Sequence, residues 1–174
     1  MPRPTDRGLV PGLGAQLAVV GACVDREPTM AGKPARPLLE ATCTRLGCHR
    51  PIFVGDRLDT DILGARNAGI TSLFVLTGAH GVHDLMDADP DRRPDHIGAD
   101  LGALLEPPQR VVVGGDAARC DGQLVRQIDG DLEVDLTNHD MAAQLSGVRA
   151  LLELVWTGRV PVNHDALSVF DLLH

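Results

Sequence analysis

The chain has 174 residues, which is enough for one compact domain with an appendage and too few for two full domains. Its net charge of −8 and its pI near 5.2 argue against general binding to nucleic acid or membranes, so the expected partners are small molecules or proteins. Four cysteines without a Cys-x-x-Cys pair, and a start without a signal peptide's apolar core, predict a cytoplasmic protein. No apolar run approaches the roughly 20 residues that span a bilayer, so we expect a soluble chain.

The first third of the chain predicts a connection followed by two helices. Prolines and glycines over residues 2–12 favour a connecting segment. The small apolar residues of 13–23 favour a buried helix. A second helix is expected over 34–47, because Pro34 suits a first turn and Gly47 suits a helix end. Its expected inner face consists of Leu39, Cys43 and Leu46.

Two apolar runs, 51–55 and 70–76, predict buried strands of a parallel sheet. The first run leads directly into Asp56, and Asp59 or Thr60 can cap a helix between the two runs. Helices and strands that alternate in short connected pieces are typical of an α/β layer with right-handed crossovers. In such sheets, ligands bind outside the carboxyl ends of the strands.

Beyond the second strand, the chain turns polar before a short strand and helix expected over 96–105. Pro107-Pro108 then marks a boundary. Residues 123–128 and 131–136 flank Asp129-Gly130, which is a strong signal for a two-residue β-hairpin. The sequence therefore predicts a hairpin within the C-terminal part.

A final amphipathic helix is predicted after this hairpin. Thr137 and Asp140 could form its capping box, and Trp156 is expected to anchor it in the core. One helical face is traced by Met141, Leu145, Val148, Leu152 and Val155.

The residues that could carry chemistry lie in two short motifs, Gly32-Lys33-Pro34 and the stretch from Gly55 to Ile62. Asp56 leaves a strand end and Asp61 lies in a first helical turn, so a sharp loop could bring both toward one hard cation such as Mg²⁺. Lys33 could face a phosphoryl oxygen. On local pattern alone, the aspartates could equally be caps and first-turn charges, and Lys33 a solvated lysine.

The same residues resemble the second half of a haloacid dehalogenase-like (HAD) phosphatase. More narrowly, they resemble subfamily IIA, the NagD-like and p-nitrophenyl phosphatase-like proteins. The resemblance runs from about Gly8 to Leu105. It is carried by Ala31-Gly-Lys-Pro34, Ile52 to Ile62, Ala65, Ala68-Gly69 and Leu76-Thr-Gly78.

The resemblance implies an α/β fold with a partial Rossmann-like HAD core. Its parallel sheet would occupy 31–107, after a connecting segment and helix over 1–30 and before an αβ extension over 108–174, which holds the β-hairpin and the last helix. It also implies a Mg²⁺-dependent phosphatase, a hydrolase of small phosphate esters that acts through an aspartyl-phosphate. The substrate would be a small phosphorylated metabolite.

The resemblance also implies roles for three residues. Lys33 would be the catalytic lysine, which offsets negative charge on the nucleophile and the phosphoryl group. Asp56 would bind Mg²⁺, and Asp61 would support the metal directly or through water.

The sequence departs from the family at the nucleophile. Family members begin with an apolar strand that leads into Asp-x-Asp-Gly, followed by a Ser/Thr motif and a cap domain, and none of these precedes Gly8. Asp129-Gly130-Asp131 fits superficially, but a hairpin turn explains it better. We therefore expect the isolated chain to be inactive.

Three alternatives follow from this departure. The chain could be a truncated or partial gene product of a phosphatase, one half of a split phosphatase completed by an N-terminal half, or a non-catalytic HAD-derived binding or regulatory module. Without the family's first strand, a central sheet edge would be open, which predicts marginal stability or self-association.

Two further motifs receive ordinary interpretations. His80-Gly-Val-His83 could bind a metal, but no nearby Cys or Glu completes a zinc spacing, so exposed loop histidines are expected. Gly12-Leu-Gly14 begins a dinucleotide motif, but Leu17 stands where the third glycine is required.

Overall fold

The computed structural model describes residues 3–173, which divide after Ala31 into two compact units. The first unit contains an antiparallel pair of strands, β1 (Arg3–Thr5) and β2 (Gly8–Val10), and the helix α1 (Leu13–Gly21). The expectation of a plain connecting segment is therefore wrong here. The Thr5 hydroxyl closes the hairpin, since it donates to Gly8 O at 2.7 Å and accepts from the Arg7 N–H at 3.3 Å.

The helix α1 forms where the sequence predicts one, but the expectation that it is buried is wrong. Leu13, Val19 and Val20 are all exposed, and no residue of α1 is buried. Its own unit offers only a two-stranded ribbon, which is too little structure to cover an apolar helix.

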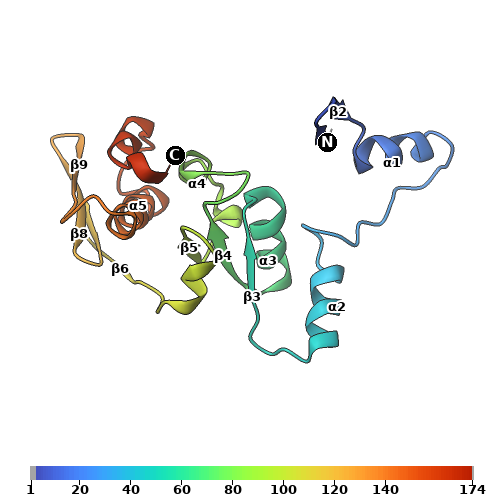
Figure 1. Ribbon diagram of the computed structural model, residues 1–174, viewed down its shortest axis with the longest axis horizontal. Helices are drawn as coiled ribbons and strands as arrows, with labels where there is room; N and C mark the ends of the chain where they lie inside the picture. Colours follow the sequence, from blue (N-terminus) through green and yellow to red (C-terminus); the bar gives the residue numbers. More distant parts are fainter. Residues whose placement is uncertain (1–2, 174) are drawn as a thin grey trace. The chain divides into compact units, whose positions relative to one another are not determined.

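The second unit is built on a parallel sheet of three strands in the order β3-β4-β5 (Figure 1). These are β3 (Ile52–Gly55), β4 (Thr71–Val75) and β5 (His96–Gly98), so both predicted strands are present. The central strand β4 is buried, but Ile52 of β3 is 51% exposed. Among the described residues β3 pairs only with β4, which explains why the expected burial of this strand is incomplete.

Two helices accompany this sheet, α2 (Pro37–Leu46) and α3 (Leu63–Ala68), and α3 lies beside β3 and β4 in Figure 1. The helix α2 begins at Pro37 instead of Pro34, because Pro37 occupies its first turn. It ends at Gly47 as predicted, with a left-handed φ of 61°. Of its expected inner face, Leu39 is buried, whereas Leu46 is 72% exposed.

A π-helical turn, η1 (Leu58–Ile62), leads into α3, which ends at Gly69 with a left-handed φ of 67°. Arg57 occupies the N-cap position of this turn, and its side chain makes no cap hydrogen bond. The expectation that Asp59 or Thr60 caps it is therefore wrong. The reason is that the acidic side chains of this turn make other contacts, described below.

The chain between β4 and the extension contains short elements. These are α4 (Val82–Met86), with Val82, Leu85 and Met86 buried, and the 3₁₀ turns η2 (Pro90–Arg92) and η3 (Leu101–Leu105). The strand β5 and η3 together occupy the stretch where a short strand and helix are predicted.

The C-terminal part contains an antiparallel sheet with consecutive strands β6 (Val111–Gly114), β7 (Ala117–Cys120), β8 (Gln123–Ile128) and β9 (Asp131–Asp135). The predicted hairpin is β8-β9, with positive φ at both Asp129 (53°) and Gly130 (95°), as a type I′ turn requires. The α/β fold with a parallel sheet, a C-terminal hairpin and a helix is confirmed. The hairpin is part of a larger sheet than the sequence indicated.

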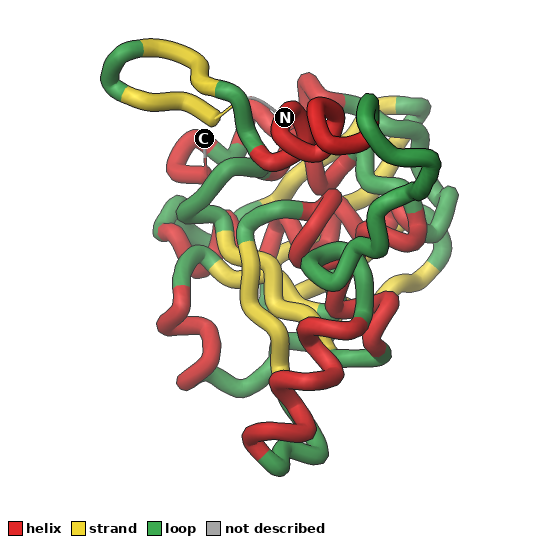
Figure 2. Tube along the Cα trace, turned by 90° about the vertical axis from the view of Figure 1, so that its right-hand side faces the viewer, coloured by secondary structure: helices red, strands yellow, loops and turns green. Residues whose placement is uncertain are grey.

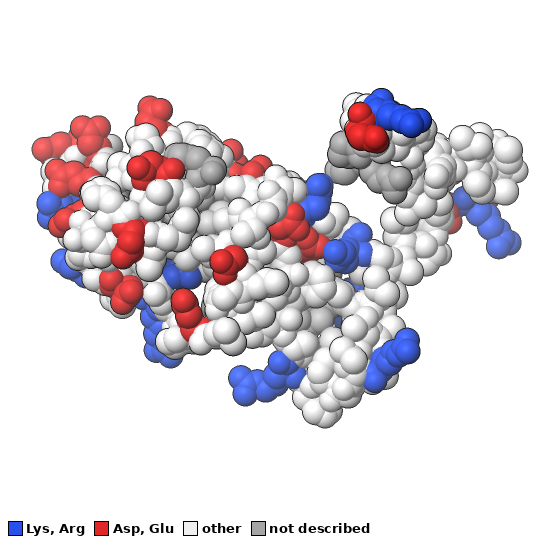
Figure 3. Space-filling model, viewed as in Figure 1, with Lys and Arg blue, Asp and Glu red and all other residues white. Residues whose placement is uncertain are grey.

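The edge strand β9 carries alternating acidic residues. Asp131, Glu133 and Asp135 are exposed, while Leu132 and Val134 pack against the core. Acidic side chains are visible over this part of the molecule in Figure 3. Charge on an edge strand opposes pairing with another chain.

The helix α5 (Met141–Trp156) packs on this sheet and forms the centre of the hydrophobic core (Figure 1). Four of the five predicted inward residues are buried, whereas Met141 is 41% exposed. The core is continuous, because Phe74 and Ile97 of the parallel sheet belong to the same buried cluster as Leu151. Figure 2 shows strands running side by side with helices beside them. Among the described residues, no helix is long and apolar enough to cross a bilayer.

The start of α5 differs from the predicted capping box. The Asp140 carboxylate caps the helix alone and accepts from the Ala143 N–H at 2.8 Å. Thr137 takes no part, because its backbone N–H and its hydroxyl bind the Gln123 side chain instead.

Two short 3₁₀ turns, η4 (His164–Val169) and η5 (Asp171–Leu173), follow α5. Phe170 and Leu173 are buried and belong to the same core.

Candidate functional site

The candidate site is built on the loops that follow β3 and β4. Asp56 comes directly after β3, and its Oδ2 accepts a hydrogen bond from the Ala79 N–H, beyond β4, at 2.7 Å. Gly78 is required for this approach: a Cβ on Gly78 would lie 2.1 Å from the Asp56 Cβ and Oδ2, far inside contact distance. The two loops therefore hold the Asp56 carboxylate at the carboxyl edge of the sheet, where α/β proteins bind ligands.

Asp61 is the second carboxylate of the site, and it is buried, with 5% of its surface exposed. Its Oδ2 accepts from the Arg57 N–H at 3.1 Å, and its Oδ1 lies 2.6 Å from Lys33 Nζ. A Cβ on Gly55 would lie 2.3 Å from the Asp61 Cβ, so Gly55 gives this side chain its space. Asp61 is thus fixed both by its own turn and by a distant lysine.

Lys33 reaches the site from the segment before α2. Its ammonium group pairs with Asp61 and lies 5.6 Å from the centre of the Phe53 ring, while 41% of its side chain stays exposed. The Asn67 side chain donates to Pro34 O at 2.9 Å, which ties the lysine's segment to α3. The structure therefore brings together Lys33 and Asp61, which are 28 residues apart in the sequence.

Asp59 contacts the Arg57 guanidinium, with Nε donating to Oδ1 at 3.1 Å and Nη2 to Oδ2 at 2.8 Å. The hydrogen bond from Arg57 is the main reason that the pKa of Asp59 lies below its ordinary value, and the same bond raises the pKa of Arg57. This pair explains why Asp59 does not cap the turn. The two side chains form a partly exposed ion pair within the loop.

His80 was considered from the sequence only as a possible metal ligand, and the structure gives it a different role. Its ring Nδ1 accepts from the Leu58 N–H at 3.0 Å, and its backbone N–H donates to Asp56 O at 3.2 Å. The expectation of two exposed loop histidines holds for His83 but is wrong for His80, which is half-buried. The only sequence signal is its place, two residues after the Thr-Gly at the end of a strand.

The oxygen donors of the site suit a hard cation. In residues 3–173, no three His, Cys, Asp or Glu side chains converge to form a complete metal site. Mg²⁺ usually keeps several waters and binds through one or two carboxylates together with substrate phosphate. The carboxylates of Asp56 and Asp61 are of the ligand type that such a Mg²⁺ site uses, and Lys33 pairs with Asp61.

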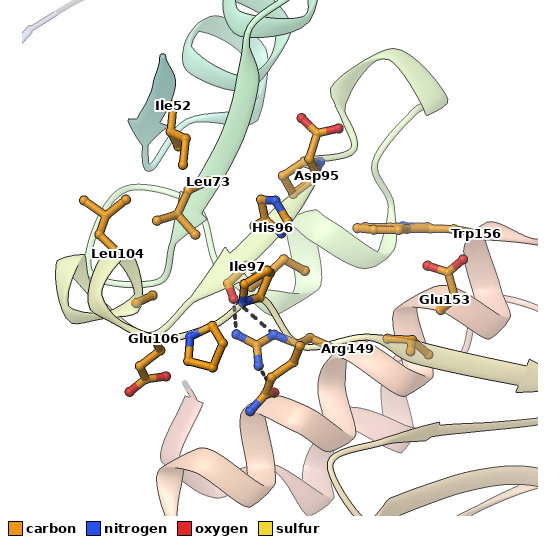
Figure 4. A pocket seen from close by; sticks show the side chains of 16 residues that line it. Ile52, Leu73, Asp95, His96, Ile97, Leu104, Glu106, Arg149, Glu153 and Trp156 are labelled. Carbon is orange, nitrogen blue, oxygen red and sulfur yellow. Dashed lines mark hydrogen bonds between the residues drawn. The ribbon is translucent and has the colours of Figure 1, made fainter. Parts of the chain in front are cut away.

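A separate cavity of about 220 Å³ lies toward the amino-terminal ends of the same strands (Figure 4). Apolar side chains such as Ile52 and Leu73 line one side, and Arg149 and Trp156 of α5 line the other. Arg149 donates through Nε to Ile97 O at 3.1 Å and also binds the Gln109 side chain, and burial lowers its pKa. None of Lys33, Asp56 and Asp61 lines this cavity.

Comparison with known proteins identifies the family. Residues 30–104 match the family described as HAD-hydrolase-like. The chain is 39% identical to D-glycerol 3-phosphate phosphatase of Mycobacterium tuberculosis over 172 residues, which cover 93% of this chain and 46% of that protein. It is 37% identical to phosphoglycolate phosphatase 2 of Arabidopsis thaliana over 109 residues, 60% of this chain and 36% of the relative. The chain thus spans less than half the length of these curated relatives.

Solved structures agree with this assignment. The crystal structure of a glycerol phosphate phosphatase from Mycobacterium tuberculosis in complex with magnesium matches with a TM-score of 0.68 and 34% identity, over 99% of this chain and 52% of that one. A 4-nitrophenylphosphatase from Thermotoga maritima matches with a TM-score of 0.52 and 37% identity, over 59% of this chain and 40% of that one. The chain therefore belongs to the haloacid dehalogenase-like hydrolases of subfamily IIA and corresponds to the C-terminal part of its relatives.

Proposed function

We propose that the chain supplies the metal-binding and phosphate-binding half of a phosphatase active site for small phosphate esters. The observation that carries this proposal is the pairing of a lysine with a buried carboxylate in the loop after β3, where a second carboxylate is held directly after the strand. Lys33 Nζ lies 2.6 Å from Asp61 Oδ1, and Asp56 is held by the Ala79 N–H from the neighbouring loop. The phosphatase names of the relatives support the same reaction class.

In this proposal each residue has a separate task. Asp56 and Asp61 hold Mg²⁺, and when bound this ion neutralises charge on the phosphoryl oxygens. Asp61 also orients Lys33 through their ion pair. The Lys33 ammonium, which remains partly exposed, stabilises the negative charge of the transferring group. Gly55 and Gly78 leave the space that both carboxylates need.

An aspartyl-phosphate mechanism also needs a nucleophilic aspartate. The sequence contains no Asp-x-Asp-Gly, and the hairpin turn explains Asp129-Gly130-Asp131, since both turn residues have positive φ. We therefore propose that turnover requires an aspartate from outside the residues described, carried by a longer form of the protein or by another chain. Without a nucleophile, the remaining groups only bind and polarise the ester.

The binding half is tested by calorimetry on the full 174-residue chain. Mg²⁺ should bind, and inorganic phosphate should bind more tightly when Mg²⁺ is present. Asp56→Asn should weaken Mg²⁺ binding by about tenfold or more, because it removes one of two charged ligands. Lys33→Met should weaken phosphate binding more than Mg²⁺ binding. The control is Asp116→Asn in the exposed β6-β7 turn, which should change neither.

Turnover is tested with p-nitrophenyl phosphate. The chain alone should show no hydrolysis above background, whereas a form completed by a segment with Asp-x-Asp-Gly should hydrolyse the ester, and Asp56→Asn should abolish that activity. Hydrolysis by the chain alone that survives Asp56→Asn would contradict the proposal. Absence of Mg²⁺ binding would contradict it equally.

The second candidate function is a non-catalytic module that binds Mg²⁺ and phosphate for regulation. It would use the same contacts of Lys33, Asp56 and Asp61 and would need no nucleophile. This function predicts binding by calorimetry with no hydrolysis in any completed form, so the turnover experiment separates the two candidates.

A further inference from the structure

His80 joins the loop after β4 to the loop after β3 through two hydrogen bonds. Its backbone N–H donates to Asp56 O at 3.2 Å, and its ring Nδ1 accepts from the Leu58 N–H at 3.0 Å. These contacts fall on the residues immediately before and after Arg57. One histidine therefore holds the loop on both sides of that residue.

The Leu58 N–H needs such a partner. It belongs to the start of η1, where a helix has backbone donors without an intrahelical acceptor, and the Arg57 side chain at the N-cap position makes no cap hydrogen bond. Leu58 itself is buried, so a lost hydrogen bond there would leave a donor away from water. The His80 ring supplies the acceptor from a different loop.

The contact also defines the state of the ring. Because the donor is a backbone N–H, Nδ1 must offer its lone pair, and the proton of the neutral ring must lie on Nε2. This is a specific expectation about one histidine in the resting protein.

From Leu58, the connection continues to the carboxylate of Asp61. Arg57 and Asp61 are joined by two hydrogen bonds. The Arg57 N–H donates to Asp61 Oδ2 at 3.1 Å, and the Asp61 N–H donates to Arg57 O at 2.9 Å. A shift of Leu58 would move the Arg57 carbonyl that precedes it and with it Asp61. Asp56, on the other side, is held by the same loop through the Ala79 N–H.

We infer that His80 is a positioning residue for the proposed metal site, an inference that rests on the function proposed above. Its ring fixes the start of η1 and so places Asp56 and Asp61 relative to each other. It acts through the Leu58 backbone and touches neither the metal nor the phosphoryl group.

The first experiment needs no variant. Nitrogen-15 NMR of the imidazole rings in the metal-free chain should show His80 with an unprotonated Nδ1 and a protonated Nε2. A dominant tautomer with the proton on Nδ1 would overturn the inference. This measurement tests the hydrogen bond between His80 and Leu58 even if a substitution at position 80 prevents folding.

The second experiment compares two substitutions of similar size. His80→Asn keeps an acceptor, because its Oδ1 lies at the place of Nδ1, whereas His80→Leu has none. In His80→Leu the Leu58 amide should exchange about fivefold faster or more, as expected for one lost hydrogen bond, and the Mg²⁺ dissociation constant should rise by about the same factor. In His80→Asn both should stay within about twofold of the wild type. His49→Leu, at an exposed histidine after α2, serves as the control.

The outcomes separate this inference from the proposed function. Equal Mg²⁺ affinity in the wild type and His80→Leu, or equal losses in the Asn and Leu variants, would overturn the positioning role alone. Failure of the wild-type chain to bind Mg²⁺ would overturn the proposed function, and the Leu58 exchange rates and the tautomer would still show whether His80 holds the loop.

Discussion

The two ends of the parallel sheet differ in the residues that they hold. At the carboxyl ends, Asp56 and Asp61 are held by backbone N–H groups and by Lys33 in a space that glycines keep open. At the amino-terminal ends, an apolar cavity of about 220 Å³ contains Arg149, whose hydrogen bonds go to Ile97 O and Gln109.

The comparison shows that the enclosed cavity and the residues proposed to bind metal and phosphate lie at opposite ends of the sheet. Many apolar side chains line the cavity, and the Arg149 guanidinium beside it donates from α5 to Ile97 O of the sheet. The loop site has charged groups whose positions are set from several directions, which is what a metal and a phosphoryl group require. We therefore expect substitutions at the two ends to separate ligand binding from stability.

The largest effect is expected for Gly78→Ala. Its new Cβ would lie 2.1 Å from the Asp56 Cβ and Oδ2, so Asp56 must move. Overpacking of this kind costs about 1–3 kcal/mol of stability, and Mg²⁺ affinity should fall by about tenfold or more. Denaturant unfolding and calorimetry measure the two effects.

The matched control for that substitution is Gly114→Ala in β6, where the described residues leave space around an added Cβ. This variant should bind Mg²⁺ like the wild type. If Gly78→Ala bound Mg²⁺ normally, the claim that Mg²⁺ binding requires the space beside Gly78 would be wrong.

Arg149→Met should lower stability without affecting the metal site. It removes the hydrogen bonds to Ile97 O and Gln109 from a partly desolvated position, which should cost about 1–3 kcal/mol in denaturant unfolding. Arg119→Met, at an exposed position of β7, should change stability by less than about 0.5 kcal/mol. A large change of Mg²⁺ affinity in Arg149→Met would show that the two ends of the sheet do not act independently.

Trp156→Phe tests the link between the cavity and α4. The indole N–H donates to Leu85 O at 3.0 Å, and its loss should cost about 1 kcal/mol while the aromatic packing is largely kept. Thermal or denaturant unfolding measures the effect. An unchanged midpoint would show that this hydrogen bond does not stabilise the junction.

The smallest effect is expected for Asp59→Asn, and it depends on pH. The hydrogen bond from Arg57 lowers the pKa of Asp59 below its ordinary value of 3.8. The stability that the ionised Asp59 contributes is therefore present above pH 3.8 and is lost as the pH falls through the lower pKa of the folded state. Because the pair is partly exposed, the difference from wild type at neutral pH should be about 0.2–1 kcal/mol. Urea unfolding should show this difference at neutral pH and none in strong acid; a constant difference would contradict the assignment.

Local elements were predictable where a residue type leaves little choice. Gly47 and Gly69 end helices in left-handed conformations, and Asp129-Gly130 forms the hairpin turn with both φ values positive. The family resemblance likewise indicated Lys33, Asp56 and Asp61, and the structure places Lys33 against Asp61. The roles of these residues in catalysis remain predictions.

Contacts between distant segments were not predictable in the same way. The patterns of α1 and β3 indicate burial, but burial depends on what packs against them, and both have an exposed side in the described chain. Asp59 and Thr60 are residue types that often cap helices, but the Asp59 carboxylate binds the Arg57 guanidinium instead. No local pattern indicates the hydrogen bond of His80, because its ring accepts from the Leu58 N–H of a different loop.

The sequence by itself determined the parallel strands, the acidic loop after the first of them, the hairpin and the long C-terminal helix, since each depends on residues close together in the chain. Only the tertiary structure decided that Gly78 makes room for Asp56, that Lys33 pairs with Asp61, and that His80 accepts from Leu58. Those contacts join residues that are at least 22 positions apart, and no local preference specifies which partners meet.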